Sequence, residues 1–427
     1  MYSQWERLEE MTKLLYPAYL RLGGTAADQT VFMINGTEPN CTNTIPLILT
    51  GSSWTKINNF AMNTKLNFIF DFNVLLRIGK KWNSSNAKSI IKYSQSKGFA
   101  MDFQLGNEPN SFIHVFNELI RPEQLAEDYK QLRKIMNSST LYSTSKLIGP
   151  EVTKPKAMLL PSVTYLKQFL MATHDIDVVS WHQYYMQGKT ATLNDFINPE
   201  TFDELSSQIK HVSKVTKRYS KKPIWISETG SASGGGAPNL SDRFVASFLW
   251  LDKLGLAARM GISVVIRHGL MNGYYALIDS ELMPSPDFWI SFFYKNLVGP
   301  RVLEIVKRRD DVELDHLRYY VHCSASQIMG DEQIVVFALN ISNKTENVIV
   351  SGFGMLYPIY SFTFTPENSS LTSKTVYLNG KKLEYDRQSI YDLLKNPAEV
   401  KFPLVLPGYS IAFWTFHGAD NCLCDRA

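Results

Sequence analysis

The sequence contains no apolar run of about 18 residues, so no segment predicts a membrane-spanning helix. It also lacks a strong excess of charge, because 44 Lys and Arg residues stand against 40 Asp and Glu residues, for a net charge of +4. This balance argues against a general nucleic-acid-binding protein, while local basic clusters remain available to an anionic substrate. Cysteine is scarce, and the four cysteines lack the paired spacing of a zinc site. We expect neither a metal nor a redox cofactor.

No secretory signal peptide opens the chain, so its compartment has to be inferred from chemistry. Eight Asn-x-Ser/Thr sites are a high density for a cytosolic enzyme. A disulfide from Cys323 to either C-terminal cysteine, Cys422 or Cys424, would need an oxidising compartment. We therefore expect a secreted or lysosomal protein. The eight sites are Asn35, Asn40, Asn83, Asn137, Asn239, Asn340, Asn343 and Asn368.

Strand-like and helix-like segments alternate over the first 299 residues. Short apolar runs are separated by amphipathic stretches such as 122–136 and 202–219, and this alternation predicts a parallel sheet with right-handed crossovers. We count seven strands, whereas eight are needed to close a (β/α)₈ TIM barrel. We therefore expect a barrel over residues 1–299 whose first strand lies upstream of Met1. The predicted strands are Tyr19–Leu22, Leu66–Phe70, a strand through Phe103, Lys146–Ile148, Ile176–Ser180, Pro223–Ser227 and Ile262–Ile266.

The pattern changes beyond Pro300. Short runs of alternating apolar residues, such as 317–322 and 409–416, are typical of antiparallel strands, and Asn379-Gly380 is a hairpin signal. We expect a C-terminal antiparallel β-sandwich over residues 300–427. With 44% hydrophobic and 12% aromatic residues in 427 positions, the chain has enough apolar material for both units.

Two glutamates follow strands of the predicted barrel. Glu108 comes after the apolar alternation of residues 100–105 and before Pro109, which cannot continue a strand. Glu228 follows the buried strand 224–227, and by our count these are the fourth and seventh strands. Both acids should therefore face the mouth where barrel enzymes keep their chemistry. Two carboxylates across a sugar suit glycoside hydrolysis with retention, if the carboxyl groups lie about 5–5.5 Å apart.

Four longer motifs carry a resemblance to a known family. The segments GNEPNSF, WHQYY, ETGSASGGGAPNLSD and FLWLDKLGLAARMGISVVIRH resemble the heparanases, the retaining endo-β-glucuronidases of glycoside hydrolase family 79. The likeness, which is to an invertebrate-like heparanase, runs from about Leu15 to the C-terminus. It implies cleavage of internal glucuronide bonds in heparan sulfate. It also assigns the acid/base to Glu108 and the nucleophile to Glu228, in agreement with the strand count.

The resemblance further implies residues that bind the substrate. Asn107 would bind the 2-hydroxyl of glucuronic acid, and Tyr184 would lie beside the nucleophile. Backbone N–H groups and hydroxyls would hold the sugar carboxylate without placing a cation beside Glu228, while basic residues in barrel-top loops would bind sulfates. The carboxylate-binding group is Thr25, Gly234, Gly235 and Tyr275, and the sulfate-binding group is Lys154, Lys156 and Lys189.

Some positions depart from the family pattern. Residues 38–55 contain no Lys or Arg where a second basic loop is expected, and the segment 25–65 is too short for an excisable linker, so we expect a single chain. At His268 the active members carry glutamine, and the IRH triplet is shared with the inactive heparanase-2 branch. By position relative to the family's last cysteine, we expect Cys323 to pair with Cys424, and we expect a monomer.

Three functions stay open at this stage. The first is a retaining endo-β-glucuronidase acting on heparan sulfate, and the second keeps the mechanism but acts on another glucuronic-acid glycan. The third is a heparan-sulfate-binding pseudoenzyme, suggested by His268 and the absent strand. The inactive branch lacks the nucleophilic glutamate, whereas Glu228 is present here. Turnover separates the enzymes from the pseudoenzyme, which would bind without cleaving.

Overall fold

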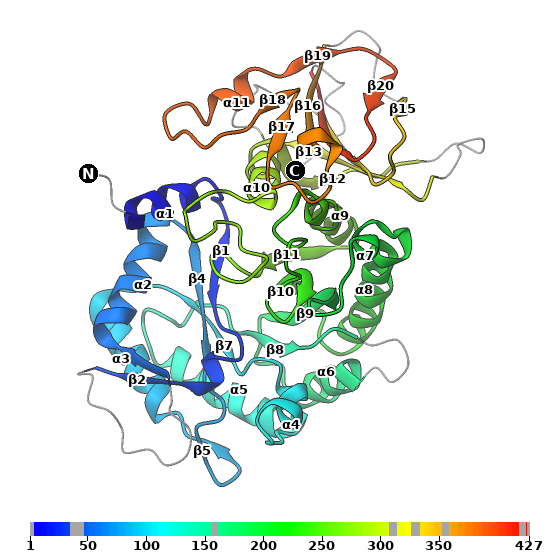
Figure 1. Ribbon diagram of the computed structural model, residues 1–427. Coiled ribbons are helices and arrows are strands. Elements are labelled where there is room, and N and C mark those ends of the chain that lie inside the picture. The colour runs from blue at the N-terminus through cyan, green and yellow to red at the C-terminus, as the bar shows by residue number, and fades with distance from the viewer. Residues whose placement is uncertain are drawn as a thin grey trace.

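The structure is a computed structural model that describes residues 4–34, 47–155, 161–306, 314–325, 334–351, 358–417 and Cys424. A barrel of parallel strands surrounded by helices packs beside an antiparallel sheet that is formed by the last third of the chain, from Val298 onward (Figure 1). Both predicted architectures, an α/β barrel and an antiparallel β unit, are confirmed. Within the described ranges, no helix is long and apolar enough to cross a membrane.

Seven parallel strands form the wall of the barrel in two sheets. One sheet is three-stranded, in the order β1-β4-β7, and the other is four-stranded, in the order β8-β9-β10-β11. A bridge between Phe103 and Leu147 links the two sheets. Each strand overlaps a predicted segment. The strands are β1 (Tyr19–Leu22), β4 (Asn67–Phe72), β7 (Asp102–Leu105), β8 (Ile148–Val152), β9 (Val178–Gln187), β10 (Ile224–Ser233) and β11 (Ile262–Arg267).

The wall of the barrel is open between β1 and β11. Among the described residues no ladder joins these two strands, and a cavity of about 640 Å³, the seam cavity, is lined by both of them. Its lining includes Pro17 and Lys295 at the amino ends of the strands and Glu228 and His268 at the carboxyl ends. The described strands are thus the seven counted in the sequence, and the seam cavity reaches the end of the barrel that holds the two glutamates.

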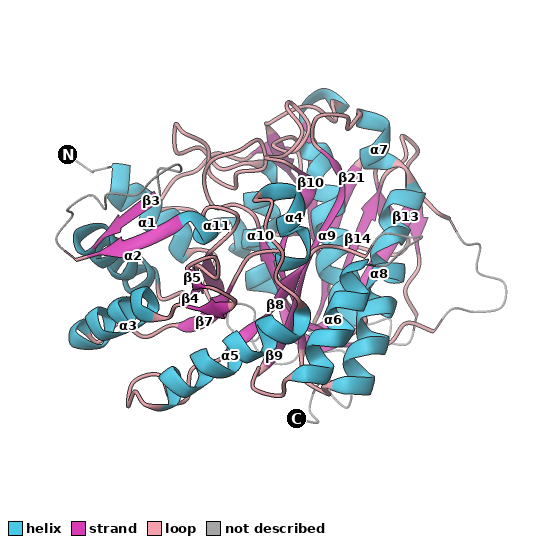
Figure 2. Ribbon diagram, turned by 90° about the horizontal axis from the view of Figure 1, so that it is seen from below, coloured by secondary structure: helices cyan, strands magenta, loops and turns pink. Residues whose placement is uncertain are grey.

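Helices cover the outside of the barrel (Figure 2). Their inner faces carry apolar residues three or four positions apart, as in α5, where Leu125, Tyr129 and Leu132 are fully buried. α9 is buried almost all round because it packs against both the barrel and the C-terminal sheet. These helices are α1 (Gln4–Lys13), α2 (Gly51–Thr64), α3 (Ser85–Lys97), α4 (Phe112–Val115), α5 (Pro122–Asn137), α6 (Pro161–Ala172), α7 (Leu193–Ile197), α8 (Pro199–Tyr219), α9 (Phe244–Arg259) and α10 (Pro286–Leu297). A further short helix, α11 (Asp392–Lys395), lies between two strands of the C-terminal unit.

The C-terminal unit is a large antiparallel sheet with a small second layer. The large sheet runs β12-β13-β14-β21-β16-β17-β18, with β19 also paired to β16, and β15 pairs with β20 in the second layer. Its strands are β12 (Val298–Val302), β13 (Leu317–Ser324), β14 (Ile334–Asn340), β15 (Glu346–Val348), β16 (Ile359–Pro366), β17 (Val376–Leu378), β18 (Lys381–Lys382), β19 (Ala398–Val400), β20 (Leu404–Leu406) and β21 (Ser410–Phe416). β12 begins at Val298, just before the predicted boundary at residue 300.

Both faces of the large sheet are covered. Along β14, Val336 packs with the second layer, whereas Phe337 packs toward the barrel against Tyr294 of α10. Burial on both faces explains why β14 is apolar from Ile334 to Leu339. A disulfide joins Cys323 to Cys424, the pairing that the family resemblance implies. Two small ladders were not predicted: β2 (Thr30–Met33) with β3 (Leu47–Thr50), and β5 (Arg77–Ile78) with β6 (Lys81–Trp82).

Every second side chain of a barrel strand points inward, so the side chains in the interior of the barrel are stacked in layers. The lower layer is apolar and consists of Ile69, Ile148, Val178 and Trp225, with Tyr19, Val264 and Ile266 packed against them. Two residues beyond Tyr19 lies Arg21, and two residues beyond Ile69 lies Asp71, and these form an ion pair. A buried charged layer therefore lies directly above the apolar one, and it supports the functional groups at the mouth.

Candidate active site

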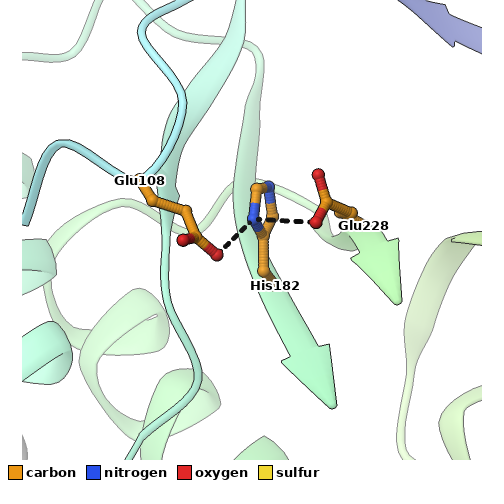
Figure 3. A group of neighbouring side chains, drawn as sticks. All are labelled: Glu108, His182 and Glu228. Atoms are coloured by element: carbon orange, nitrogen blue, oxygen red, sulfur yellow. Dashed lines mark hydrogen bonds and ion pairs between the residues drawn. The ribbon is translucent and has the colours of Figure 1, made fainter. Parts of the chain in front are cut away.

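Glu108 and Glu228 lie on either side of His182 at the mouth of the barrel (Figure 3). A carboxylate oxygen of each acid and a ring nitrogen of His182 all lie within 4.8 Å of one another. His182 Nδ1 is 2.9 Å from Glu108 Oε1 and 3.9 Å from Glu228 Oε1. The structure thus brings together the two acids that the strand count placed at one end of the barrel.

Irregular backbone aims both acids into the mouth. Glu108 adopts a left-handed conformation (φ 55°, ψ 51°), which is strained for a residue with a side chain, and it precedes a 3₁₀ turn that starts at Pro109. The prediction that Glu228 ends its strand is wrong, because β10 continues to Ser233 alongside an equally extended β9. Instead, the register of β10 against both neighbours shifts between Ile226 and the residues that follow. Such a bulge re-aims a side chain within a continuing strand.

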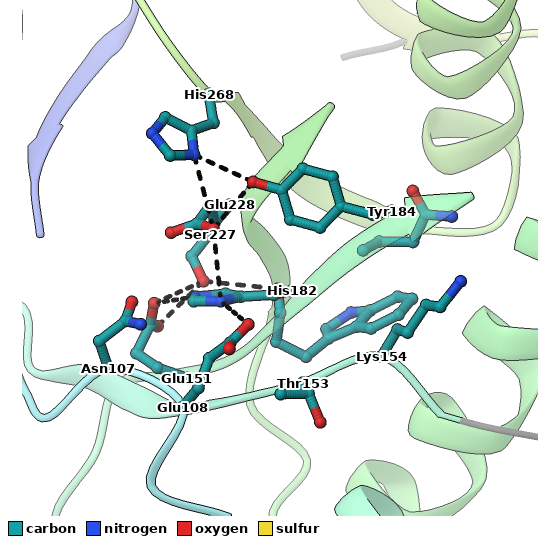
Figure 4. A network of polar contacts seen from close by, with 12 residues as sticks. Asn107, Glu108, Glu151, Thr153, Lys154, His182, Tyr184, Ser227, Glu228 and His268 are labelled. Carbon is teal, nitrogen blue, oxygen red and sulfur yellow. Dashed lines mark hydrogen bonds and ion pairs between the residues drawn. The ribbon is translucent and has the colours of Figure 1, made fainter. Parts of the chain in front are cut away.

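Polar groups surround the Glu228 carboxylate (Figure 4). The Tyr184 hydroxyl donates to Oε1 at 2.8 Å, and Arg21 Nη1 donates to Oε2 at 2.8 Å. His268 Nδ1 lies 3.6 Å from Oε1. Burial alone would raise the pKa of Glu228, but the neighbouring groups, with His182 the foremost, hold that pKa well below its usual range. Glu228 is therefore ionised, as a carboxylate nucleophile must be.

Arg21 of β1 is the centre of the buried charged layer. Besides Glu228, its guanidinium lies 3.3 Å from Asp71 and 3.2 Å from Glu151, and it donates to the amide oxygen of Asn107 at 2.9 Å. Burial would lower the pKa of Arg21, but the three surrounding carboxylates raise it. The guanidinium therefore holds Glu228 and Asn107, the residue before Glu108, in one rigid group.

His182 is held from the side opposite the two acids by a buried carboxylate. Its Nε2 lies 2.9 Å from Oε2 of Glu151, which also accepts a hydrogen bond from Ser227 Oγ at 2.9 Å. Burial would lower the pKa of His182, but Glu228, Glu108 and Glu151 together raise it to about 10. His182 is therefore an imidazolium at neutral pH, and it places a fixed positive charge between the two acids.

The predicted substrate-binding residues near the nucleophile lie around this centre. Asn107 is buried, and its backbone N–H donates to Asp28 Oδ2 at 2.8 Å. The Tyr275 hydroxyl lies 3.1 Å from His268 Nδ1. Gly234 and Gly235 follow β10 with positive φ angles of 74° and 92°, and no atom lies within 4 Å of where a Cβ would be. A side chain would be strained at either glycine, and the open space leaves their backbone accessible.

The remaining predicted residues are Thr25, Lys154, Lys156 and Lys189. Thr25 is exposed and follows Gly24, which lines the seam cavity. Lys189 is exposed after β9, whereas the Lys154 ammonium donates to the Tyr185 carbonyl at 2.9 Å. Lys156 lies outside the described residues. Of the two described lysines, Lys189 is accessible to a substrate chain, and Lys154 already has a protein partner.

Sequence reasoning missed the groups beneath the two acids. Arg21, Asp71, Glu151 and His182 are all nearly or fully buried and belong to the charged layer. A usable signal was present, since each is a charged or titratable residue inside a strand that is mostly apolar or aromatic. On β1 and β4 the charge also falls two residues beyond an inward-facing apolar residue, where alternation points it into the same interior.

The cluster of Glu108, His182 and Glu228 has the donor types of a metal site. It fits a metal ion poorly, because both ring nitrogens of the His182 imidazolium already donate to carboxylates and Arg21 is paired with Glu228. The site instead consists of two facing carboxylates, Glu108 and Glu228, with the His182 imidazolium between them.

An α/β barrel with two facing carboxylates at the mouth defines the chain as a glycoside hydrolase. Comparisons with known proteins agree. Residues 3–255 match the model of the glycosyl hydrolase family 79 N-terminal domain, and the chain belongs to that family. It is 38% identical over 381 residues to heparanase of Mus musculus, covering 87% of this chain and 70% of that protein. It is 30% identical over 461 residues to hyaluronoglucuronidase of Hirudo nipponia, covering 98% and 91%.

A solved structure shows the same fold across both units. The complex of 4-O-α-L-rhamnosyl-β-D-glucuronidase from Fusarium oxysporum superimposes with a TM-score of 0.65 at 16% sequence identity. The match covers 97% of this chain and 92% of that chain. At this identity the likeness concerns the fold alone.

Proposed function

We propose that this chain is a retaining endo-β-glucuronidase that hydrolyses internal β-1,4 glucuronide bonds of heparan sulfate. Its similarity to a heparanase and to a hyaluronoglucuronidase supports a glycosidase acting on glucuronide linkages. The observation that carries retention is the spacing of the acids, whose carboxylate oxygens approach within 4.8 Å. Inverting enzymes need roughly 6.5–9.5 Å between the two carboxyl groups to admit a water molecule, whereas retaining enzymes need about 5–5.5 Å.

The proposed mechanism is a double displacement. Glu228 attacks the anomeric carbon while Glu108 transfers its proton to the departing oxygen, and a covalent glycosyl-enzyme results. Water then attacks the same carbon, with Glu108 removing its proton and Glu228 leaving. Asn107, fixed by Arg21, is placed one residue from the acid/base to bind the sugar's 2-hydroxyl.

His182 serves both half-reactions electrostatically. Before the attack the negative charge lies on Glu228, and after it the charge lies on Glu108, because Glu228 has become an ester. The imidazolium lies 3.9 Å from a Glu228 oxygen and 2.9 Å from a Glu108 oxygen, so it faces the charge at either position. A fixed cation that needs no reorganisation is the kind of group that stabilises moving charge in an active site.

A second candidate substrate is a glucuronic-acid glycan with less sulfate. It is favoured by the hydrogen bond from Lys154 to the Tyr185 carbonyl, because one of the predicted sulfate-binding lysines already has an acceptor within the protein. It is also favoured by the similarity to the leech hyaluronoglucuronidase. The mechanism is the same for both substrates.

Digestion of heparan sulfate, its unsulfated precursor polymer and hyaluronan at mildly acidic pH tests the proposal, with Glu228→Gln as the control. We expect large fragments that end in a reducing glucuronic acid, and no fragments from the variant, which should still bind heparin. Proton NMR should show the β anomer as the first-formed product. An α anomer would contradict retention, and a folded wild-type protein that binds heparin without cleaving any of the three polymers would identify a pseudoenzyme.

A further inference from the structure

His268 faces both the nucleophile and the seam cavity. It directly follows β11, its side chain is 46% exposed, and it lines the cavity together with Glu228. Its Nδ1 lies 3.0 Å from the Tyr184 hydroxyl and 3.1 Å from the Tyr275 hydroxyl. Its ring also packs on Tyr275, with centroids 4.8 Å apart. One edge of the imidazole is therefore fixed by two tyrosines.

The hydrogen bonds indicate where the ring carries its proton. The Tyr184 hydroxyl donates its single proton to Glu228, so its oxygen can only accept from His268 Nδ1. The neutral ring therefore carries hydrogen on Nδ1, and a second proton has to add at Nε2. Figure 4 shows this second nitrogen pointing away from Tyr184 and Glu228. Within the described part of the chain Nε2 makes no hydrogen bond.

The other cationic side chains that line the seam cavity already have protein acceptors. Arg21 is bound to carboxylates, and Arg267 pairs with Asp287 at 2.6 Å. Lys295 donates to the carbonyl of Pro17. Among the described lining residues, protonated His268 is thus the cation whose donor is directed at open space beside the nucleophile.

We propose that His268 recognises an acidic substituent of the substrate, a carboxylate or a sulfate on a sugar bound beside Glu228, by donating a hydrogen bond from Nε2. The inference rests on the proposed function and adds a specificity-determining residue to it. Histidine changes its charge between about pH 5 and 8. Because Nε2 is a donor only when the ring is protonated, the contact requires the imidazolium form of His268. A glutamine at this position would donate at any pH.

The groups that face His268 keep their charge across this range. On β10, Glu228 stays ionised because its pKa is well below the usual value, and on β9, His182 stays protonated because its pKa is about 10. Burial raises the pKa of Tyr275 to about 12, and Arg21 of β1 is charged throughout. Carboxylates and sulfates of the substrate do not titrate there either. Asp28, which accepts a hydrogen bond from the Asn107 backbone, has a pKa that burial raises to about 7, so it changes charge in the same range. In a protein without the Glu108 carboxyl, the part of the affinity change between pH 5 and 7.5 that a His268 substitution removes therefore reports on His268.

Calorimetric binding on a Glu108→Gln background tests the inference, since this background should hold the oligosaccharide uncleaved. The probes are a sulfated heparan tetrasaccharide and an unsulfated tetrasaccharide with the same glucuronic acids. We expect the Kd to rise about tenfold from pH 5 to pH 7.5, as for the loss of one charged hydrogen bond. Adding His268→Gln should reduce this change to less than about twofold. A pH dependence seen with both probes assigns a carboxylate as the partner, and one seen only with the sulfated probe assigns a sulfate.

Lys189→Gln is the matched control, because it removes an exposed lysine that the sequence predicts to bind sulfate. It should weaken binding of the sulfated probe equally at both pH values. His268→Asn provides a second variant if the glutamine variant unfolds. An unchanged pH dependence after replacing His268 overturns the inference while leaving glycan cleavage intact. If the wild-type protein neither binds nor cleaves either probe, the proposed function fails and the inference fails with it.

Discussion

His182 Nε2 lies 2.9 Å from Oε2 of Glu151, a carboxylate with no exposed surface. The imidazolium between the two acids is therefore held by a charge that is buried beneath the mouth of the barrel. Arg21 lies 3.2 Å from the same Glu151 oxygen, so two cations share one buried anion. Burying ions is costly unless each is paired, and removing one partner leaves an uncompensated charge.

Replacing Glu151 should damage both stability and the pH profile. Glu151→Gln removes a buried anion from two cations, and we expect a loss of about 3–5 kcal/mol in the free energy of unfolding. The pKa of His182 should fall from about 10 toward the ordinary histidine value, so kcat should decline above about pH 7. Ser227→Ala, which removes only a hydrogen bond to Glu151, should cost about 1 kcal/mol and leave the alkaline limb in place. Denaturant unfolding measures the loss of stability, and a pH–rate profile measures the change in kcat. If Glu151→Gln and Ser227→Ala show the same decline of kcat at alkaline pH, Glu151 does not maintain the charge of His182.

Tyr184 and its neighbour Tyr185 offer a matched pair of substitutions. Tyr184→Phe removes the 2.8 Å hydrogen bond to the Glu228 carboxylate, and we expect kcat to fall roughly 10–100-fold. The Tyr185 hydroxyl is buried without a hydrogen-bond partner in the described part of the chain, so Tyr185→Phe should change kcat less than about threefold. Steady-state kinetics on a small glucuronide decide the matter. Equal losses in the two variants would show that aromatic packing, and not the hydroxyl, is what matters.

Arg318 of β13 joins the C-terminal sheet to the barrel through two different acids. It donates to buried Asp252 of α9 at 2.6 Å and to Asp203 of α8, whose side chain is 67% exposed, at 3.0 Å. Asp252→Asn should lower the free energy of unfolding by about 3–5 kcal/mol, because it leaves a half-buried guanidinium without its main partner. Asp203→Asn should cost no more than about 1 kcal/mol, since exposed ion pairs contribute little. Similar losses from both variants in denaturant unfolding would refute the distinction.

Stability should be greatest in mildly acidic solution. The raised pKa of His182, about 10, contributes stability that is complete below about pH 6.5 and lost as the pH rises toward 10. Burial raises the pKa of Asp28 to about 7, so its contribution is also lost as the pH rises. Glu151 and Glu228 have lowered pKa values, and their contribution appears only above about pH 4.5. The melting temperature should therefore peak between about pH 4.5 and 6.5, and a maximum at pH 8 would contradict this balance.

The Cys323–Cys424 disulfide closes a loop with a sequence separation of 101 residues. Loops of about 100 residues give a stabilisation of roughly 4–5 kcal/mol in the chain-entropy model. Replacing both cysteines by serine should lower the free energy of unfolding by about that amount. Urea unfolding of the double variant, compared with the reduced wild type, measures it, and agreement of the double variant with the oxidised wild type would disprove the stabilising role.

Much of the barrel could be predicted because its strands are buried on both faces. In β4, Phe68, Phe70 and Phe72 are buried under helices, and such a strand can be recognised in the sequence by its apolar run. The hairpin at Asn379-Gly380 was readable for a similar reason, since both residues adopt positive φ angles that few others tolerate. The helix ends and the two short ladders were less predictable, because local propensity says little about pairing between distant segments.

By itself, the sequence determined the order of strands and helices, the two glutamates and the motifs of the family. Only the tertiary structure decided how those glutamates are supported. The bulge before Glu228 arises from its pairing with both neighbouring strands, and the meeting of Arg21, Glu151 and His182 joins segments far apart in the chain. Charges can be buried there because each finds its partner on a different strand, and such partners exist only once the barrel has assembled.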